Sequence, residues 1–128
     1  MNGEPAWTGA LLRDEQAVAD ARHMVRNVLT RWRLEWLADD TALVMTELVA
    51  NAVRHACGHV VRVTITLVHG SGVRVSVTDE SVELPVVQPV DVLAESGRGL
   101  HLVEATAARW GAVPFTWGKQ VWAEVASR

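Results

Sequence analysis

Residues 43–55 read LVMTELVANAVRH, a pattern that predicts a helix with apolar side chains around almost its whole circumference. A helix of this kind is buried on most of its sides. Two polar residues interrupt the apolar surface: Glu47 and Asn51 are four positions apart, so they lie about 40° apart on one helix face. Arg54 and His55 flank the same stripe one turn later. A carboxylate and an amide that are buried together need protein partners or a ligand to offset their lost hydration.

The two polar residues of this helix suit both a functional and a structural role. The Glu47 carboxylate has the chemistry of a general base, and the Asn51 amide can offer its oxygen to a hard cation such as Mg²⁺. Alternatively, Glu47 caps the helix or pairs with a neighbouring arginine. The helix alone does not decide between these interpretations.

Periodic patterns on both sides of this helix predict an α+β fold. The patterns predict three helices, which begin near Asp14, Asp39 and Leu100 and end near Arg31, Ala56 and Trp110. Alternation with a period of two predicts a hairpin through residues 61–67 and 73–79, and shorter strands are expected at 6–12, 113–117 and 120–126. We therefore expect a two-layer α/β sandwich, with three helices on one face of a mixed, mostly antiparallel sheet.

The composition limits the class of protein. The 128 residues have room for one domain, residues 1–128, with a flexible N-terminus at 1–5 and a long loop at 80–96. The net charge of −3 gives no general attraction to nucleic acid or to anionic membranes. The single cysteine, Cys57, cannot form an internal disulfide, and no apolar run approaches the length of a membrane span. Because the N-terminus also has no signal-peptide pattern, we expect a cytoplasmic protein.

Asp79 continues the inward-facing side of the predicted hairpin. Val73, Val75, Val77 and Asp79 alternate, so the carboxylate reaches the helix-covered face of the sheet at the point where a strand ends. An ionised carboxylate only accepts hydrogen bonds, and it can therefore bind an exocyclic amine such as that of adenine. Alternatively, Asp79 turns into the following loop and bonds local backbone groups.

A glycine pair opens the third predicted helix. In the segment Gly97-Arg98-Gly99-Leu100, the glycines let a ligand approach the backbone, and the free N–H groups of the helix start favour an anion. Arg98 can add positive charge at a phosphate. The segment is neither a Walker loop nor a dinucleotide-binding fingerprint. Paired glycines before a helix also occur as plain turn residues.

Together these three segments resemble the histidine-kinase-like ATPase superfamily, whose fold is the Bergerat fold of sensor kinases. Residues 47–56 resemble its N box, residues 77–79 the start of its first glycine box, and residues 97–100 its second. The short length is similar to the anti-sigma-factor serine/threonine kinase branch, of the actinobacterial type. The resemblance covers roughly residues 14–126.

The resemblance implies a set of residue roles. Glu47 would be the catalytic base, Asn51 the Mg²⁺ ligand and Asp79 the residue that reads adenine. Gly97 and Gly99 would hinge the ATP lid, with nearby backbone amides on the phosphates. The residues implied to bind the cofactor also include Arg54, Arg98 and Leu100. Residues 80–96 would form the ATP lid. The implied partners are a sigma factor and an anti-sigma-factor antagonist that is phosphorylated on serine, with a possible homodimer and no direct contact with nucleic acid or membrane.

One segment departs from the family pattern. Glu80-Ser81 follows Asp79 where the family has Asp-x-Gly-x-Gly. This difference keeps a second interpretation open, namely a non-catalytic regulator that sequesters a partner and has a degenerate ATP site. A metal centre at His55, Cys57 and His59 is disfavoured because a full tetrahedral ligand set is missing.

Overall fold

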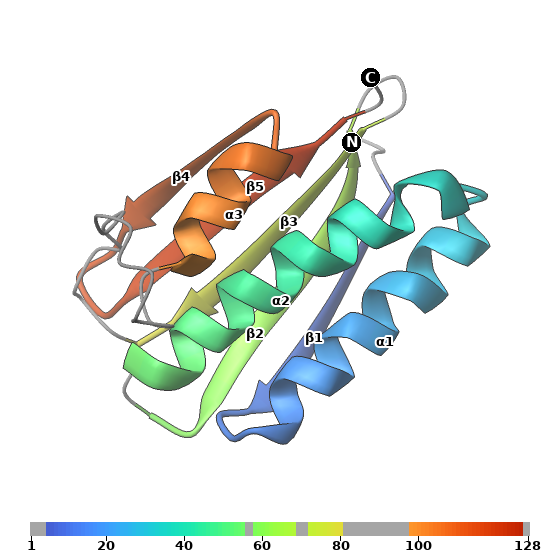
Figure 1. The fold of residues 1–128 in the computed structure, drawn as a ribbon. Helices are drawn as coiled ribbons and strands as arrows, with labels where there is room; N and C mark the ends of the chain where they lie inside the picture. Colours follow the sequence, from blue (N-terminus) through green and yellow to red (C-terminus); the bar gives the residue numbers. More distant parts are fainter. Residues whose placement is uncertain (1–4, 56–57, 69–71, 81–97, 127–128) are drawn as a thin grey trace.

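The computed structural model describes residues 5–55, 58–68, 72–80 and 98–126, which form two layers (Figure 1). Five strands make an antiparallel sheet in the order β1-β2-β3-β5-β4. The strands are β1 (Ala6–Leu12), β2 (Val60–Val68), β3 (Gly72–Asp79), β4 (Arg109–Pro114) and β5 (Lys119–Val125). The helices α1 (Gln16–Arg31), α2 (Ala38–His55) and α3 (Arg98–Thr106) cover one face, and a 3-10 turn η1 (Glu35–Leu37) leads into α2. The predicted α+β sandwich is confirmed.

Two predicted boundaries were wrong. Asp39 and Asp40 lie in the first turn of α2 and do not precede it, because η1 runs directly into the helix. The helix α3 ends at Thr106, and the expected helical residue Trp110 belongs to β4. The cause is a change of backbone partner: the Ala107 N–H donates to Val103 within the helix, whereas the Ala108 N–H donates to the carbonyl of Glu124 in β5. Residues 81–97, which include most of the predicted lid loop, lie outside the described residues.

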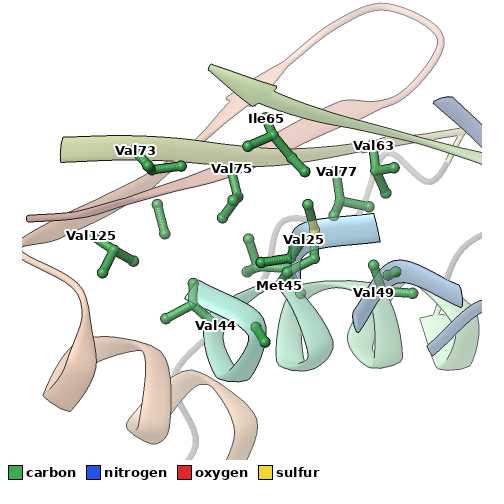
Figure 2. Close-up of a cluster of buried hydrophobic side chains, with 14 of the residues drawn as sticks. Val25, Val44, Met45, Val49, Val63, Ile65, Val73, Val75, Val77 and Val125 are labelled. Atoms are coloured by element: carbon green, nitrogen blue, oxygen red, sulfur yellow. The ribbon is translucent and has the colours of Figure 1, made fainter. Parts of the chain in front are cut away.

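The core lies between the inward face of the sheet and the helices, as Figure 2 shows. Inward positions alternate along the three central strands and are almost fully buried, namely Val61, Val63, Ile65, Val73, Val75, Val77, Val121, Ala123 and Val125. They meet Val44, Met45 and Val49 of α2 and Val25 of α1. Each large apolar side chain that leaves water here contributes about 1.5–3 kcal/mol. This packing holds α2 across the middle of the sheet.

The end of α2 is held by Arg13 from the segment between β1 and α1. Its Nε donates to the Gly58 carbonyl at 2.8 Å, and its Nη1 donates to the Val53 carbonyl at 3.0 Å. A cation at the C-terminal end of a helix also interacts favourably with the helix dipole. Gly58 has a φ of +82°, a backbone conformation that favours glycine after a helix. The chain therefore leaves α2 at a fixed point and enters β2.

At the same end of the sheet, β5 begins very close to the last residue of β3. Gly118 directly precedes β5, and a Cβ atom on it would overlap the backbone carbonyl of Asp79. The turn before it is closed by the Phe115 N–H, which donates to the Gly118 carbonyl at 2.7 Å. The exposed rings of Phe115 and Trp117 stack with centroids 5.1 Å apart. Only glycine fits at position 118 without displacing β3.

On the opposite, helix-free face of the sheet, two arginines share one carboxylate. Glu124 accepts hydrogen bonds from Arg109 Nε at 2.7 Å and from Arg74 Nε at 3.1 Å. The Arg74 guanidinium also lies 4.2 Å from the ring centroid of Trp122. The hydrogen bond from Arg109 lowers the pKa of Glu124 below its ordinary value, although partial burial opposes the shift. The same contact raises the pKa of Arg109.

This shift predicts a pH-dependent stability. A carboxyl group whose pKa is lowered in the folded state contributes stability above its unfolded pKa and loses it as the pH falls through the folded pKa. Glu124→Gln should therefore lower the free energy of unfolding at pH 7, and the difference from wild type should shrink as the pH falls below 4.5. Urea unfolding followed by tryptophan fluorescence measures this. A difference that stays constant with pH would contradict it.

A second prediction concerns the close approach at Gly118. Gly118→Ala should lower the free energy of unfolding by about 1–3 kcal/mol, because its Cβ has no space beside the Asp79 backbone. Gly72→Ala is the matched control in the same sheet, since its Cβ would meet the nearest atom at 3.4 Å. The control should change stability by less than about 1 kcal/mol. Equal losses in both variants would show that Gly118 is not under a special constraint.

Candidate functional site

Four segments meet at one end of the molecule. Figure 1 shows that the C-terminal part of α2, the end of β3, the start of α3 and the start of β5 lie at the end opposite the two chain termini. The helix α2 packs against α3, β3 and β5, and β3 pairs with β5 up to its last residue. The predicted functional residues come from these segments. The fold therefore brings the three sequence motifs to the same end of the sheet.

Glu47 and Asn51 lie on α2 and are partly buried. The sequence predicted that both side chains are fully buried, and this prediction was wrong. The helix α2 is not covered on every side, since the apolar residue Leu43 is also exposed. Their neighbours Leu48 and Val49 are buried and hold the helix in place. Among the residues that the structure describes, neither side chain makes a hydrogen bond or an ion pair. The alternative in which Glu47 pairs with a neighbouring arginine is not observed within that part of the chain.

The other predicted phosphate-binding residues are distributed over two helix ends. Arg54 lies in the last turn of α2 and is exposed to solvent. Arg98 and Gly99 are the first residues of α3, and Leu100 after them is buried. Gly97 lies outside the described residues. The helix α3 begins at Arg98, two residues before the predicted start near Leu100, and it packs against α2.

Asp79 lies on the inward face of the sheet, as its parity predicted. It continues the row of Val73, Val75 and Val77 and is almost completely buried. Its carboxylate accepts two hydrogen bonds from Lys119 Nζ, at 3.0 Å to Oδ1 and 3.1 Å to Oδ2. The Asp79 carboxylate therefore has a partner on the neighbouring strand β5, which the sequence analysis did not foresee.

Sequence reasoning missed Lys119. It is the cross-strand partner of Asp79 in the β3–β5 pair, and its side chain is 5% exposed beside the 1% exposed side chain of Asp79. The alternation of apolar residues along β5 could have indicated it, because Lys119 lies two positions before Val121 and therefore on the same, inward side of the strand. Removing one member of such a pair typically costs about 3–5 kcal/mol, because the other charge stays buried without compensation.

The described residues include one donor atom that suits Mg²⁺, the amide oxygen of Asn51. In the described part of the chain, no three His, Cys, Asp or Glu side chains gather in one place, and Cys57 lies outside it. Mg²⁺ usually takes one or two protein oxygen ligands together with substrate phosphates and water. The Asn51 amide, partly buried and without a bonding partner among described residues, offers one such oxygen.

Comparisons with known proteins find a similar sequence and a similar fold. An uncharacterized protein of Streptomyces coelicolor, SCO4941, is 39% identical over 70 residues, which are 52% of this chain and 67% of that protein. The histidine kinase domain of the Erythrobacter litoralis EL346 blue-light-activated histidine kinase has a similar fold, with a TM-score of 0.53 and 15% identity. That similarity covers 87% of this chain but spans only 59% of the other. No helix among the described residues is long and apolar enough to cross a membrane.

The family profile of the histidine kinase-like ATPase domain matches residues 11–112. The matched segment starts in β1 and ends in β4, and it includes Glu47, Asn51 and Asp79. It ends before Gly118 and Lys119. Because the match covers most of the 128 residues, the chain belongs to the histidine kinase-like ATPase domain family.

Proposed function

We propose that this chain is an ATP-binding regulatory protein kinase of the anti-sigma-factor type, which phosphorylates a serine of an anti-sigma-factor antagonist and sequesters a sigma factor. One observation carries the proposal. Glu47 and Asn51 present a carboxylate and an amide, one helical turn apart, that bond to no other described residue. They lie on the helix that packs against both β3, which ends in Asp79, and α3. Family membership supports ATP binding and a kinase or ATPase activity.

The proposed reaction uses the side chains as follows. Asp79 accepts a hydrogen bond from the exocyclic amine of adenine. Asn51 supplies a ligand to Mg²⁺, which when bound neutralises charge on the phosphates. Arg54, with the segment from Gly97 to Leu100, binds the phosphates through charge and backbone N–H groups. Glu47 takes the proton from the serine hydroxyl while the serine oxygen forms a bond to the γ-phosphorus. The bond between that phosphorus and the bridging oxygen to the β-phosphate breaks, and ADP leaves.

The chain's surface favours protein partners. Its net charge of −3 is unsuited to nonspecific nucleic-acid binding, so specificity would come from contacts with a sigma factor and its antagonist. The proposal places the protein in the cytoplasm, where ATP and sigma factors are found, and includes a homodimer. The solved kinase domain of similar fold is longer than this chain.

A second candidate is a non-catalytic regulator that sequesters a partner. One feature of the sequence favours it. Glu80-Ser81 follows Asp79 where the family pattern is Asp-x-Gly-x-Gly, so that both glycines are lost. In this case the site would bind nucleotide weakly or not at all.

Calorimetry with Mg-ATP tests nucleotide binding. Wild type should bind, and Asn51→Ala and Asp79→Asn should each weaken binding about tenfold or more, because each removes a contact to a charged or polar group of the ligand. Asn27→Ala is the matched control, since Asn27 is an exposed amide on α1. It should bind like wild type. An absence of binding heat in wild type would reject the ATP-dependent proposal and leave the second candidate.

Phosphoryl transfer tests the catalytic base. Glu47→Gln keeps the size of the side chain and removes the proton acceptor, so Mg-ATP binding should persist while transfer of labelled γ-phosphate to serine of the antagonist falls about 10²–10⁴-fold. Glu35→Gln, at an exposed position in η1, is the control. Undiminished transfer by Glu47→Gln would reject the base assignment. ATP binding without any transfer in wild type would favour the non-catalytic regulator.

A further inference from the structure

Lys119 bonds to the residue that is proposed to read adenine. Its Nζ bridges Oδ1 and Oδ2 of Asp79 at 3.0 and 3.1 Å, and both side chains are almost completely buried. Lysine is rarely buried to this degree unless it is paired. Resting on the proposed ATP-binding function, the geometry points to Lys119 as a positioning residue, which holds the Asp79 carboxylate in the orientation that selects adenine.

The neighbouring positions argue against a purely stabilising role. The next inward pair along the same two strands is Val77 with Val121, and both are apolar and buried. Apolar residues of similar volume stabilise a core at least as well as a buried ion pair does, because an ion pair must first lose its hydration. On the inward face, the charged pair stands at the last step of the β3–β5 pairing, where the candidate site begins, whereas the Arg74–Glu124 pair of the same strands lies on the opposite face. A charged pair at this position is better suited to binding a ligand than to stabilising the core.

The chemistry of the pair explains how it would select a base. An ionised carboxylate only accepts hydrogen bonds, and it can accept about four of them. Two bonds from one ammonium group therefore fix the plane of the Asp79 carboxylate without excluding a further bond from an exocyclic amine. Adenine presents such an amine at the position where guanine presents a carbonyl oxygen. Adenine is neutral and does not compensate the negative charge of the Asp79 carboxylate. The ammonium group of Lys119 would provide that compensation.

The experiment isolates the bond to the amine. Calorimetry compares the magnesium complexes of ATP and of purine riboside triphosphate, which lacks the exocyclic amine but keeps the sugar and phosphates. Wild type should prefer ATP by about tenfold or more, the worth of a hydrogen bond to a charged group. In Asp79→Asn most of this preference should be lost. In Lys119→Met the ratio of the two affinities should fall to about the Asp79→Asn value, although Asp79 is still present.

Matched variants separate recognition from stability. Val125→Ala removes a buried side chain at the far end of β5, so it should destabilise the fold and leave the affinity ratio unchanged. Lys119→Arg keeps the charge and should retain most of the preference for ATP. If Lys119→Met alone does not fold, Asp79→Asn combined with Lys119→Met removes both buried charges. The double variant should show the same ratio as Asp79→Asn, because the two residues act as one unit.

The outcomes distinguish this inference from the function on which it rests. If wild type binds neither nucleotide, the proposed function fails and the role of Lys119 fails with it. If wild type prefers ATP and Lys119→Met weakens both nucleotides equally, the ion pair is structural and only the positioning role is overturned. If the preference rises in Lys119→Met, Lys119 competes with adenine for Asp79, which also overturns it. A Lys119→Arg variant that has lost the preference while remaining folded contradicts the role of the charge.

Discussion

The apolar face of α2 packs on the valines of β2, β3 and β5, and this contact fixes the rotation of the helix about its own axis (Figure 2). Successive residues of a helix are about 100° apart, so the burial of Val44, Met45 and Val49 decides where every other side chain of α2 lies. Glu47 and Asn51 are consequently placed at the margin of the contact and only partly buried. A core that consists of aliphatic side chains thus positions the polar groups of the candidate site.

The second constraint is the register between β3 and β5. It sets Asp79 opposite Lys119 and places Gly118 against the backbone of Asp79. The two constraints meet because α2 packs against both strands. Among the described residues of the strands, the inward face of the sheet is apolar except at this end, where Asp79 and Lys119 lie. Natural proteins tolerate such departures from local rules mainly at functional sites, which agrees with the position of the ion pair.

Local periodicity was sufficient to predict most of the fold, and it failed where a residue's neighbour is distant in the chain. Alternation along residues 73–79 correctly predicted that Asp79 points inward. Lys119 was missed because it meets Asp79 only when β5 pairs with β3, after α3 and β4 have intervened, and sequence pattern does not specify such long-range pairing. Trp110 was assigned to a helix for the same reason, since the backbone bond from Ala108 to Glu124 has no local signature.

We propose that the ends of α2 and β3 and the starts of α3 and β5 form one nucleotide site. The most direct measurement is a titration of the isotope-labelled chain with Mg-ATP, followed through the backbone amide resonances by nuclear magnetic resonance. The claim predicts that the largest shifts occur together, with one affinity, at Asn51, Asp79, Leu100 and Lys119. It would be contradicted by shifts confined to the opposite face of the sheet around Arg74 and Trp122, or by saturating ATP that leaves all amides unchanged.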